Sequence, residues 1–328
     1  MRTKSVAAAS ILIAVLVCTM PAAAQQDDKK ALEVIANARK AIGGKKLDSI
    51  KSLSVQGAAQ RNVGNFQMNG DLELLIDLPD KYMKSETSSG GPMTIANVSG
   101  FSGDRPLKSS APGGIAQGGA MIIRMGAGPG GPIGGGGEKP TPEQQAQIDR
   151  QLVQSARQEI CRLMLGWFAT THPAVTAQYR YAGEAESPDG KAYVVDVKNA
   201  DGFAARLFID EKTELPLMVT YQGPQPRMIT SGGPRLAGGA SGQSARQLTD
   251  EERNKAQADA QKQLEELRKQ PPAIVEYALY FDDWRDVDGI KFPHSFRRAT
   301  AGATTEEWTI TRVKVNPKID PKKFESVQ

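Results

Sequence analysis

The sequence of 328 residues predicts an α+β fold in which helices cover one extended antiparallel sheet. Three observations support this fold class. Short runs that alternate apolar and polar residues recur between turn residues, as strands with one solvated face do. Two segments, 28–44 and 141–173, instead carry apolar residues at helical spacing. Two low-complexity stretches, 111–140 and 223–272, interrupt the strand pattern and are expected to be insertions.

The N-terminus has the order of features found in a secretory signal peptide. Arg2 and Lys4 precede an uncharged run at 6–17, and small residues follow up to Ala24. This order predicts a signal peptide over 1–24, cleavage near Ala24 and a periplasmic protein. The apolar run is shorter than the roughly 20 residues that cross a membrane.

The composition of the mature chain argues against several classes of protein. Loss of Arg2 and Lys4 with the signal peptide leaves 39 basic residues against 37 acidic ones, which does not indicate a nucleic-acid partner. Cys161 is then the only cysteine, so no intramolecular disulfide can form. Cys18 is a weak candidate for a lipid anchor, because Val17 precedes it where a small residue is expected.

The first part of the mature chain predicts one helix and four strands. Apolar residues at helical spacing predict a helix over 28–44 that ends at Gly43 and Gly44. Alternating patterns then predict strands at 47–60, 66–79, 81–88 and 93–103. The next stretch, 111–140, is dominated by Gly and Pro and predicts a flexible loop.

The second part predicts a long helix, seven strands and a polar insertion. Thr141, Pro142 and Gln144 fit a capping box with proline at the first helical position. An apolar stripe ending at Trp167 predicts that this helix lies on the sheet. Strand patterns follow at 174–185, 191–199, 203–213, 215–222, 273–287, 290–300 and 304–315. Within the insertion, 249–270 predicts an exposed helix with few large apolar residues.

One stretch near the C-terminus gathers four aspartates, a tryptophan and a histidine, and therefore invites a catalytic interpretation. Asp288–Gly289 between two alternating runs is a strong hairpin signal, which places the aspartates around a turn. Asp282 and Asp283 are adjacent on a strand and point to opposite faces, so they do not form an acid–base pair. A hydrolase that uses His294 with Asp282 or Ser295 stays open as an alternative, although nothing in the sequence orders these groups into a triad.

Other candidate sites lack the context that their chemistry needs. Trp284 and Ser295 occupy the positions where a calcium loop has its first and last ligands. The glycines of 126–131 match a dinucleotide-binding spacing, but no helix begins there to bind a pyrophosphate. Cys161 lies in the apolar part of a helix, as buried structural thiols do. We therefore expect no catalytic residue, no metal and no cofactor.

The remaining candidates are aromatic residues that helical spacing and strand alternation place toward the inner face of the sheet. They are Trp167, Phe168, Phe208, Phe292, Phe296 and Trp308. Beneath an amphipathic helix such residues form either a filled core or an apolar pocket for an acyl chain, and the same pattern serves both.

Three stretches resemble the periplasmic outer-membrane lipoprotein carrier and sorting proteins, the LolA/LolB-like family. They are the first helix running into 47–57, the strand pair 207–222, and 280–296 followed by the terminal strand and 316–325. The resemblance implies a strongly curved antiparallel sheet, a half-open barrel covered by helices, as a single domain over 25–328. It also implies a non-enzymatic carrier or sensor in the cell envelope that binds an acyl chain or a lipoprotein.

A second interpretation gives the protein a different role. The aromatic residues are then ordinary core, and the inserted helix at 249–270 binds a protein partner in the cell envelope, without lipid binding.

Overall fold

The structure, a computed structural model, describes most of the predicted strands and both long helices. The described residues are 22–63, 66–90, 93–108, 116–117, 120–121, 141–188, 190–225, 227–228, 271 and 273–325. The apolar run of the predicted signal peptide, most of the stretch 111–140 and the predicted inserted helix at 249–270 lie outside them.

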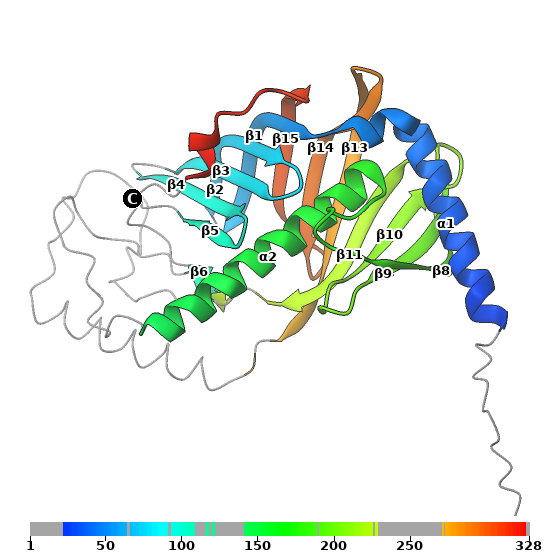
Figure 1. Ribbon diagram of the computed structural model, residues 1–328, viewed down its shortest axis with the longest axis horizontal. Helices are drawn as coiled ribbons and strands as arrows, with labels where there is room; N and C mark the ends of the chain where they lie inside the picture. The colour runs from blue at the N-terminus through cyan, green and yellow to red at the C-terminus, as the bar shows by residue number, and fades with distance from the viewer. Residues whose placement is uncertain are drawn as a thin grey trace, which may run out of the picture.

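The described residues form one 12-stranded antiparallel sheet that is not closed, so the predicted fold class is confirmed (Figure 1). In spatial order its strands are β5 (Arg105–Lys108), β4 (Met93–Ser102), β3 (Lys81–Gly90), β2 (Phe66–Asp77), β1 (Ser52–Val63), β15 (Ala303–Val315), β14 (Ile290–Thr300), β13 (Ile274–Val287), β11 (Pro216–Pro224), β10 (Ala204–Asp210), β9 (Gly190–Lys198) and β8 (Gln178–Ser187). Strand β1 pairs with β15, which places the two ends of the domain side by side in the middle of the sheet.

The hairpin predicted near the C-terminus is present between β13 and β14. Asp288 and Gly289 have positive φ angles of 57° and 80°, the backbone geometry that a two-residue primed turn requires. The side chain of Asp286 accepts a hydrogen bond from the Gly289 amide at 2.9 Å. Asp286 and Asp288 therefore serve this turn.

Two helices cover the concave side of the sheet (Figure 1). Helix α1 (Ala22–Ile42) packs along β8 and contacts β14, whereas α2 (Pro142–Phe168) reaches from β4 and β5 to β10, β11 and β13. The predicted capping box is formed, because Thr141 Oγ1 accepts from the Gln144 amide at 3.3 Å while Gln144 Oε1 accepts from the Thr141 amide at 2.9 Å. Among the described residues, neither helix combines the length and apolarity needed to cross a membrane.

Short elements complete the two ends of the domain. A 3₁₀ helix, η1 (Gly44–Ser49), joins α1 to β1. A second one, η2 (Pro321–Phe324), is capped by Asp320, whose side chain accepts from the Lys322 amide. Phe324 packs against Leu75, Met83 and Leu107, so the C-terminal segment covers the sheet face that α2 does not.

The described parts of the two predicted insertions pair with each other. β6 (Ala116–Gln117) and β7 (Ala120–Met121) are antiparallel, and β7 pairs in parallel with β12 (Arg227–Met228). Four residues of the stretch predicted as a loop are therefore strands. The second insertion also begins later than expected, because Gly223 and Pro224 still pair with β13.

Candidate functional site

The aromatic half of the inner face, meaning the sheet face covered by α2, is built from rings of α2, β13, β14 and β15. Strand alternation directs Phe292 and Phe296 of β14 to this face, and the last turn of α2 delivers Trp167 and Phe168. The centroid of Phe292 lies 5.0 Å from that of Trp167 and 5.9 Å from that of Phe168. All four side chains are at most 2% exposed.

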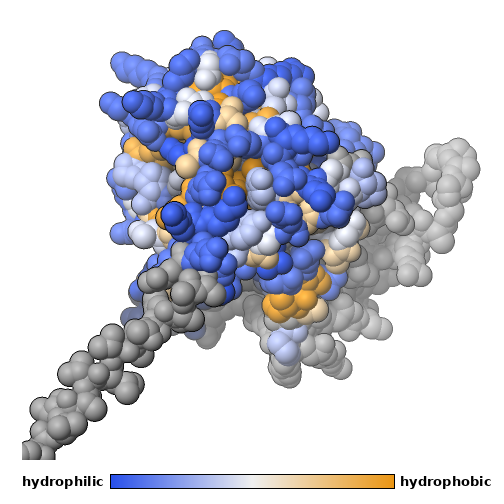
Figure 2. Space-filling model, turned by 90° about the vertical axis from the view of Figure 1, so that its right-hand side faces the viewer, coloured by the Kyte–Doolittle hydropathy of each residue, from blue (hydrophilic) through white to orange (hydrophobic). Residues whose placement is uncertain are grey.

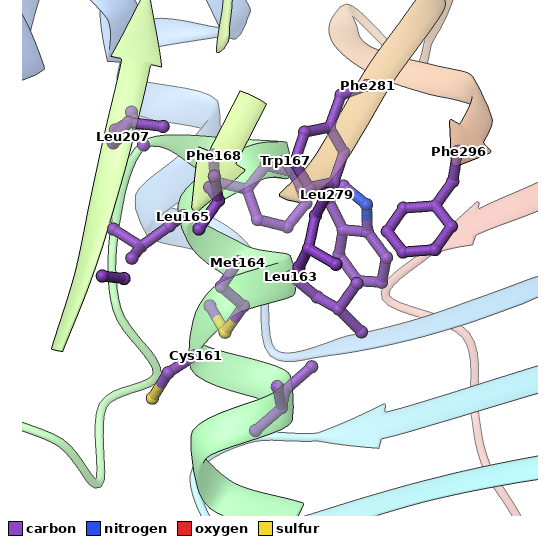
Figure 3. Close-up of a cluster of buried hydrophobic side chains, with 14 of the residues drawn as sticks. Cys161, Leu163, Met164, Leu165, Trp167, Phe168, Leu207, Leu279, Phe281 and Phe296 are labelled. Carbon is purple, nitrogen blue, oxygen red and sulfur yellow. The ribbon is translucent and has the colours of Figure 1, made fainter. Parts of the chain in front are cut away.

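Two further rings extend this half toward the centre of the sheet. Phe296 stacks on Trp308 with centroids 4.1 Å apart, and the ring of Phe281 lies edge-on to Phe296 at 5.7 Å. Figure 3 shows Trp167, Phe281 and Phe296 among the aliphatic side chains of α2. A Cβ atom at Gly166 would lie 2.0 Å from the Phe281 ring, so only glycine allows α2 to approach β13 this closely. The aromatic half is a packed interior in this structure.

Five of the six aromatic residues predicted from the sequence meet in this one cluster. Phe208 does not, because Ala205, Leu207 and Ile209 are the residues of β10 that point inward. Phe208 is half-buried on the outer face together with Arg206 and Asp210. Arg206 and Asp210, which point to the same side of β10 as Phe208, are the sequence signal that could have predicted this outward position.

A second part of the inner face, which the sequence analysis did not identify, is charged. The charged half consists of Arg61 (β1), Lys84 and Glu86 (β3), Glu159 (α2), Arg298 (β14) and Glu306 (β15). The sequence contained the signal, because Lys84 and Glu86 occupy every second position after Tyr82, and Glu306 and Trp308 are likewise separated by one residue. Both Tyr82 and Trp308 are buried under α2, and so the charged residues share their face.

Glu306 and Lys84 are the best-connected members of the charged half. Glu306 lies 2.8 Å from Arg298 Nη1, 3.1 Å from Arg61 Nη2 and 3.7 Å from Lys84 Nζ. Lys84 Nζ is also 3.1 Å from both Glu86 and Glu159. The exposed fractions of the Lys84 and Glu306 side chains are 6% and 4%. Such charges are stable in the interior only when they remain paired.

The electrostatics of the charged half keep Glu306 and Lys84 ionised. Burial alone would raise the pKa of Glu306, but Lys84, Arg298 and Arg61 together hold it well below the usual range. Burial would lower the pKa of Lys84, yet the carboxylates of Glu159, Glu306 and Glu86 raise it. The neighbouring charges therefore outweigh desolvation at both sites.

The charged and aromatic halves meet at Trp308. Its indole Nε1 donates a hydrogen bond to Glu306 at 2.7 Å, and Lys84 Nζ lies 4.9 Å from the centroid of its ring. The same ring stacks on Phe296. One side chain thus belongs to both halves, and the inner face is continuous from rings to charges.

The residues considered for catalysis do not form a site, because His294 lies on the other face of the sheet from Asp282 and Ser295. Asp282 and Ser295 are paired across β13 and β14 and are exposed. His294 is buried on the other side of β14, and its Nδ1 lies 3.0 Å from the Phe292 carbonyl oxygen. Burial raises the pKa of the Cys161 thiol to about 11, which keeps it protonated. No group of three His, Cys, Asp or Glu side chains is placed to hold a metal ion within the described ranges.

A shallow depression of about 370 Å³ lies on the surface beside α1 and η1. Leu32 lines it and is 57% exposed. Arg39, Lys40 and Lys45 also line it, and Arg39 donates a hydrogen bond to Asp48 at 2.6 Å. Figure 2 shows the face of the molecule that lies on the α1 side of Figure 1, where apolar spots are small and set among hydrophilic residues.

Comparison with known proteins gives fold-level similarity only. No family model matches the sequence, and no curated protein matches it. A LolA superfamily protein from Nitrosomonas europaea is 8% identical, covers 90% of this chain and 97% of its own, and has a TM-score of 0.45. An outer membrane lipoprotein-sorting domain from Vibrio parahaemolyticus is 9% identical, with the same coverage and a TM-score of 0.40. A DUF1329 family protein from Desulfovibrio piger is 8% identical with a TM-score of 0.37, again covering 90% of this chain and 97% of its own.

Proposed function

We propose that this protein is a non-enzymatic binding protein of the periplasm that takes up acyl chains, from a lipid or a lipoprotein, on the inner face of its sheet. One observation carries the proposal: α2 lays Trp167 and Phe168 onto Phe292 in the hollow of a sheet that is not closed. The helix and the sheet are separate layers. An acyl chain that replaces the contacts of α2 therefore meets a preformed aromatic surface.

The energetics of such an exchange are balanced. The large apolar side chains that α2 buries are Ile160, Leu163, Met164, Leu165, Trp167 and Phe168. At roughly 1.5–3 kcal/mol each, freeing all six costs about 9–18 kcal/mol. Burial regains about 0.8 kcal/mol per CH₂ group, or about 9 kcal/mol for a chain of roughly 12 carbons. One chain offsets a partial displacement of α2, and a lipid with two or three chains offsets a complete one.

The first test is uptake of a fluorescent fatty acid by the delipidated protein, together with native mass spectrometry of the protein purified from its own cell envelope. We expect saturable uptake and a co-purifying lipid or acylated peptide. A folded protein that takes up no fatty acid and carries no bound mass would overturn the proposal.

A cross-linking test addresses the route of entry. Arg157 of α2 pairs with Asp104, in the turn between β4 and β5, at 2.9 Å. Cysteines at these two positions, joined by a short bis-maleimide, would hold α2 on the sheet, and the substitution Cys161→Ala removes the one other thiol of α2, which displacement of the helix would expose. We expect uptake by this variant before cross-linking and none after it. Equal uptake in both forms would contradict entry by displacement of α2.

The proposed location rests on the N-terminal sequence. Arg2, Lys4 and the apolar run to Val17 are the parts of a signal peptide, and the protein should be found in the periplasmic fraction with residue 25 as its first. An intact N-terminus on protein from the cytoplasmic fraction would contradict this location.

A second candidate function is an interaction module without lipid binding, and the depression beside α1 favours it. The exposed Leu32 with Arg39, Lys40 and Lys45 offers an apolar anchor with a cationic rim to a protein partner in the envelope. In this case the wild type should take up no fatty acid, and Leu32→Ser and deletion of 249–270 should each weaken partner capture.

A further inference from the structure

The net charge of the charged half changes when α2 leaves the sheet. With α2 in place it holds three cations, Arg61, Lys84 and Arg298, and three carboxylates, Glu86, Glu159 and Glu306. Five of the six residues belong to the sheet, and Glu159 alone belongs to the helix. Displacement of α2 therefore turns a formally neutral site into one with a net charge of +1.

The carboxylate of Glu159 occupies the position that an anion bound to the cations of the sheet would take. Its Oε1 lies 3.1 Å from Lys84 Nζ and 3.5 Å from Arg298 Nη2, and so one carboxylate bridges two strands of the sheet. The two cations lose this partner when α2 moves. Lys84 then keeps Glu86 and Glu306, and Arg298 keeps Glu306, so three cations share two carboxylates and the vacated position is attractive to another anion.

Arg298, which contacts Glu159, and Arg61, which shares Glu306 with Arg298, carry further donors. In the described part of the chain, Arg61 Nε and Arg298 Nε are buried without a hydrogen-bond partner. A carboxylate or phosphate head carries more than one acceptor oxygen and can use such donors in addition to the contacts of Glu159. The stacked rings of Trp308 and Phe296 begin directly beside the cations and lead into the aromatic half.

We infer that Glu159 is an internal placeholder for the anionic head of an amphiphilic ligand, whose alkyl chain lies along the aromatic half of the inner face. This inference rests on the proposed uptake of acyl chains and names the ligand class. The ligand has a carboxylate or phosphate head within reach of Lys84 and Arg298. An uncharged chain of the same length lacks the group that replaces Glu159.

The test compares ligands that differ only in their heads. Affinities of the full delipidated chain for decanoate, decyl phosphate and decanol are measured by isothermal titration calorimetry, with acetate as the anion that lacks a chain. The wild type should bind at least one of the two anionic amphiphiles more tightly than decanol, and the tighter one identifies the head. Acetate should not bind.

The variant Glu159→Gln removes the competing anion and keeps the side-chain shape. We expect its affinity for the preferred anionic amphiphile to rise roughly tenfold, the scale of one charge-assisted contact, with no change for decanol. The matched control is Glu143→Gln, the same substitution at an exposed position of the same helix, which should change neither affinity.

The outcomes separate the inference from the proposed function. Equal gains for decanol and the anionic amphiphile in Glu159→Gln would mean that the helix is merely loosened, and the placeholder role would be wrong while uptake stands. Equal wild-type affinities for all three amphiphiles would also refute it, without any variant. Acetate binding as tight as decanoate would refute an amphiphilic ligand. Failure of every amphiphile to bind folded protein would overturn both the inference and the proposed function.

Discussion

The aromatic and charged halves of the inner face lie under the same helix but hold it in different ways. Trp167 and Phe168 contact rings that are almost completely buried, and this attraction depends on area rather than direction. Glu159 instead meets two cations, Lys84 and Arg298, at defined distances. Burial of rings supplies net stability, whereas buried ion pairs contribute little net stability and are costly to break. The aromatic half thus keeps α2 on the sheet, and we expect the charged half to fix where it lies.

The largest expected effect is loss of a ring from the aromatic half. Phe292→Ala should lower the free energy of unfolding by about 3–5 kcal/mol, because the ring contacts Trp167 and Phe168 and its removal leaves a cavity. Urea denaturation followed by circular dichroism measures this change. Phe208→Ala is the matched control on the outer face, with an expected loss of about 1 kcal/mol. Equal losses at the two positions would erase the distinction between the faces.

The next effect is removal of one charge from the other half. Glu306→Gln leaves Arg61, Lys84 and Arg298 short of a carboxylate and should cost about 3 kcal/mol, although the amide oxygen still accepts from Trp308. The adjacent Glu307 is exposed, so Glu307→Gln should change stability by less than about 0.5 kcal/mol. Urea denaturation midpoints of the two variants, each compared with the wild type, measure these changes in stability. A neutral or stabilising Glu306→Gln would show that the charged half tolerates an unpaired cation.

A pH effect should arise from the loop after α2 rather than from the charged half. Burial and the nearby Arg157 cation lower the pKa of His172 from 6.5 to about 4. The unfolded chain therefore binds a proton that the folded one does not, and the stability that His172 contributes is complete above pH 6.5. It is lost at about 1.4 kcal/mol per pH unit as the pH falls toward about 4. Glu306, with its lowered pKa, stays ionised across this window.

The variant His172→Asn isolates this response. Asparagine can still accept the hydrogen bond that the Ala174 amide donates to Nδ1 at 3.2 Å, but it does not titrate. Urea midpoints at pH about 7, 6 and 5 should therefore fall less steeply in the variant than in the wild type. An unchanged slope would assign the pH dependence to groups other than His172.

The sequence was sufficient to predict the long strands but not their order in the sheet. Alternation and turn residues predicted the strands around Asp288–Gly289, because both signals are local. The four residues of β5 were missed, since so short a strand shows too few alternations. The pairing of β1 with β15 joins segments about as far apart as the domain allows, and nothing in either pattern specifies its partner.

The site shows the same limit in a different form. Strand alternation was enough to place Phe208 on the outer face and Lys84 and Glu306 on the inner face. Neither placement was predicted, because we expected the inner face to be entirely apolar. Strand alternation does not predict which side chains from distant elements come together. Glu159 meets Lys84 and Arg298 only because α2 crosses from β4 to β11, an arrangement that arises from tertiary packing.

The smallest effect tests whether the two halves release α2 separately. Thr141→Ala removes the capping bond to the Gln144 amide and should cost about 1 kcal/mol, while Thr141→Ser keeps a hydroxyl and should cost less. The start of α2 is exposed, so the loss should appear as faster hydrogen exchange in its first turns. Amides of 160–168, held by the aromatic half, should exchange as in the wild type. Faster exchange along the entire helix would instead mean that the charged half has no independent hold on α2, because the aromatic contacts and the ion pairs of Glu159 would then open as one unit.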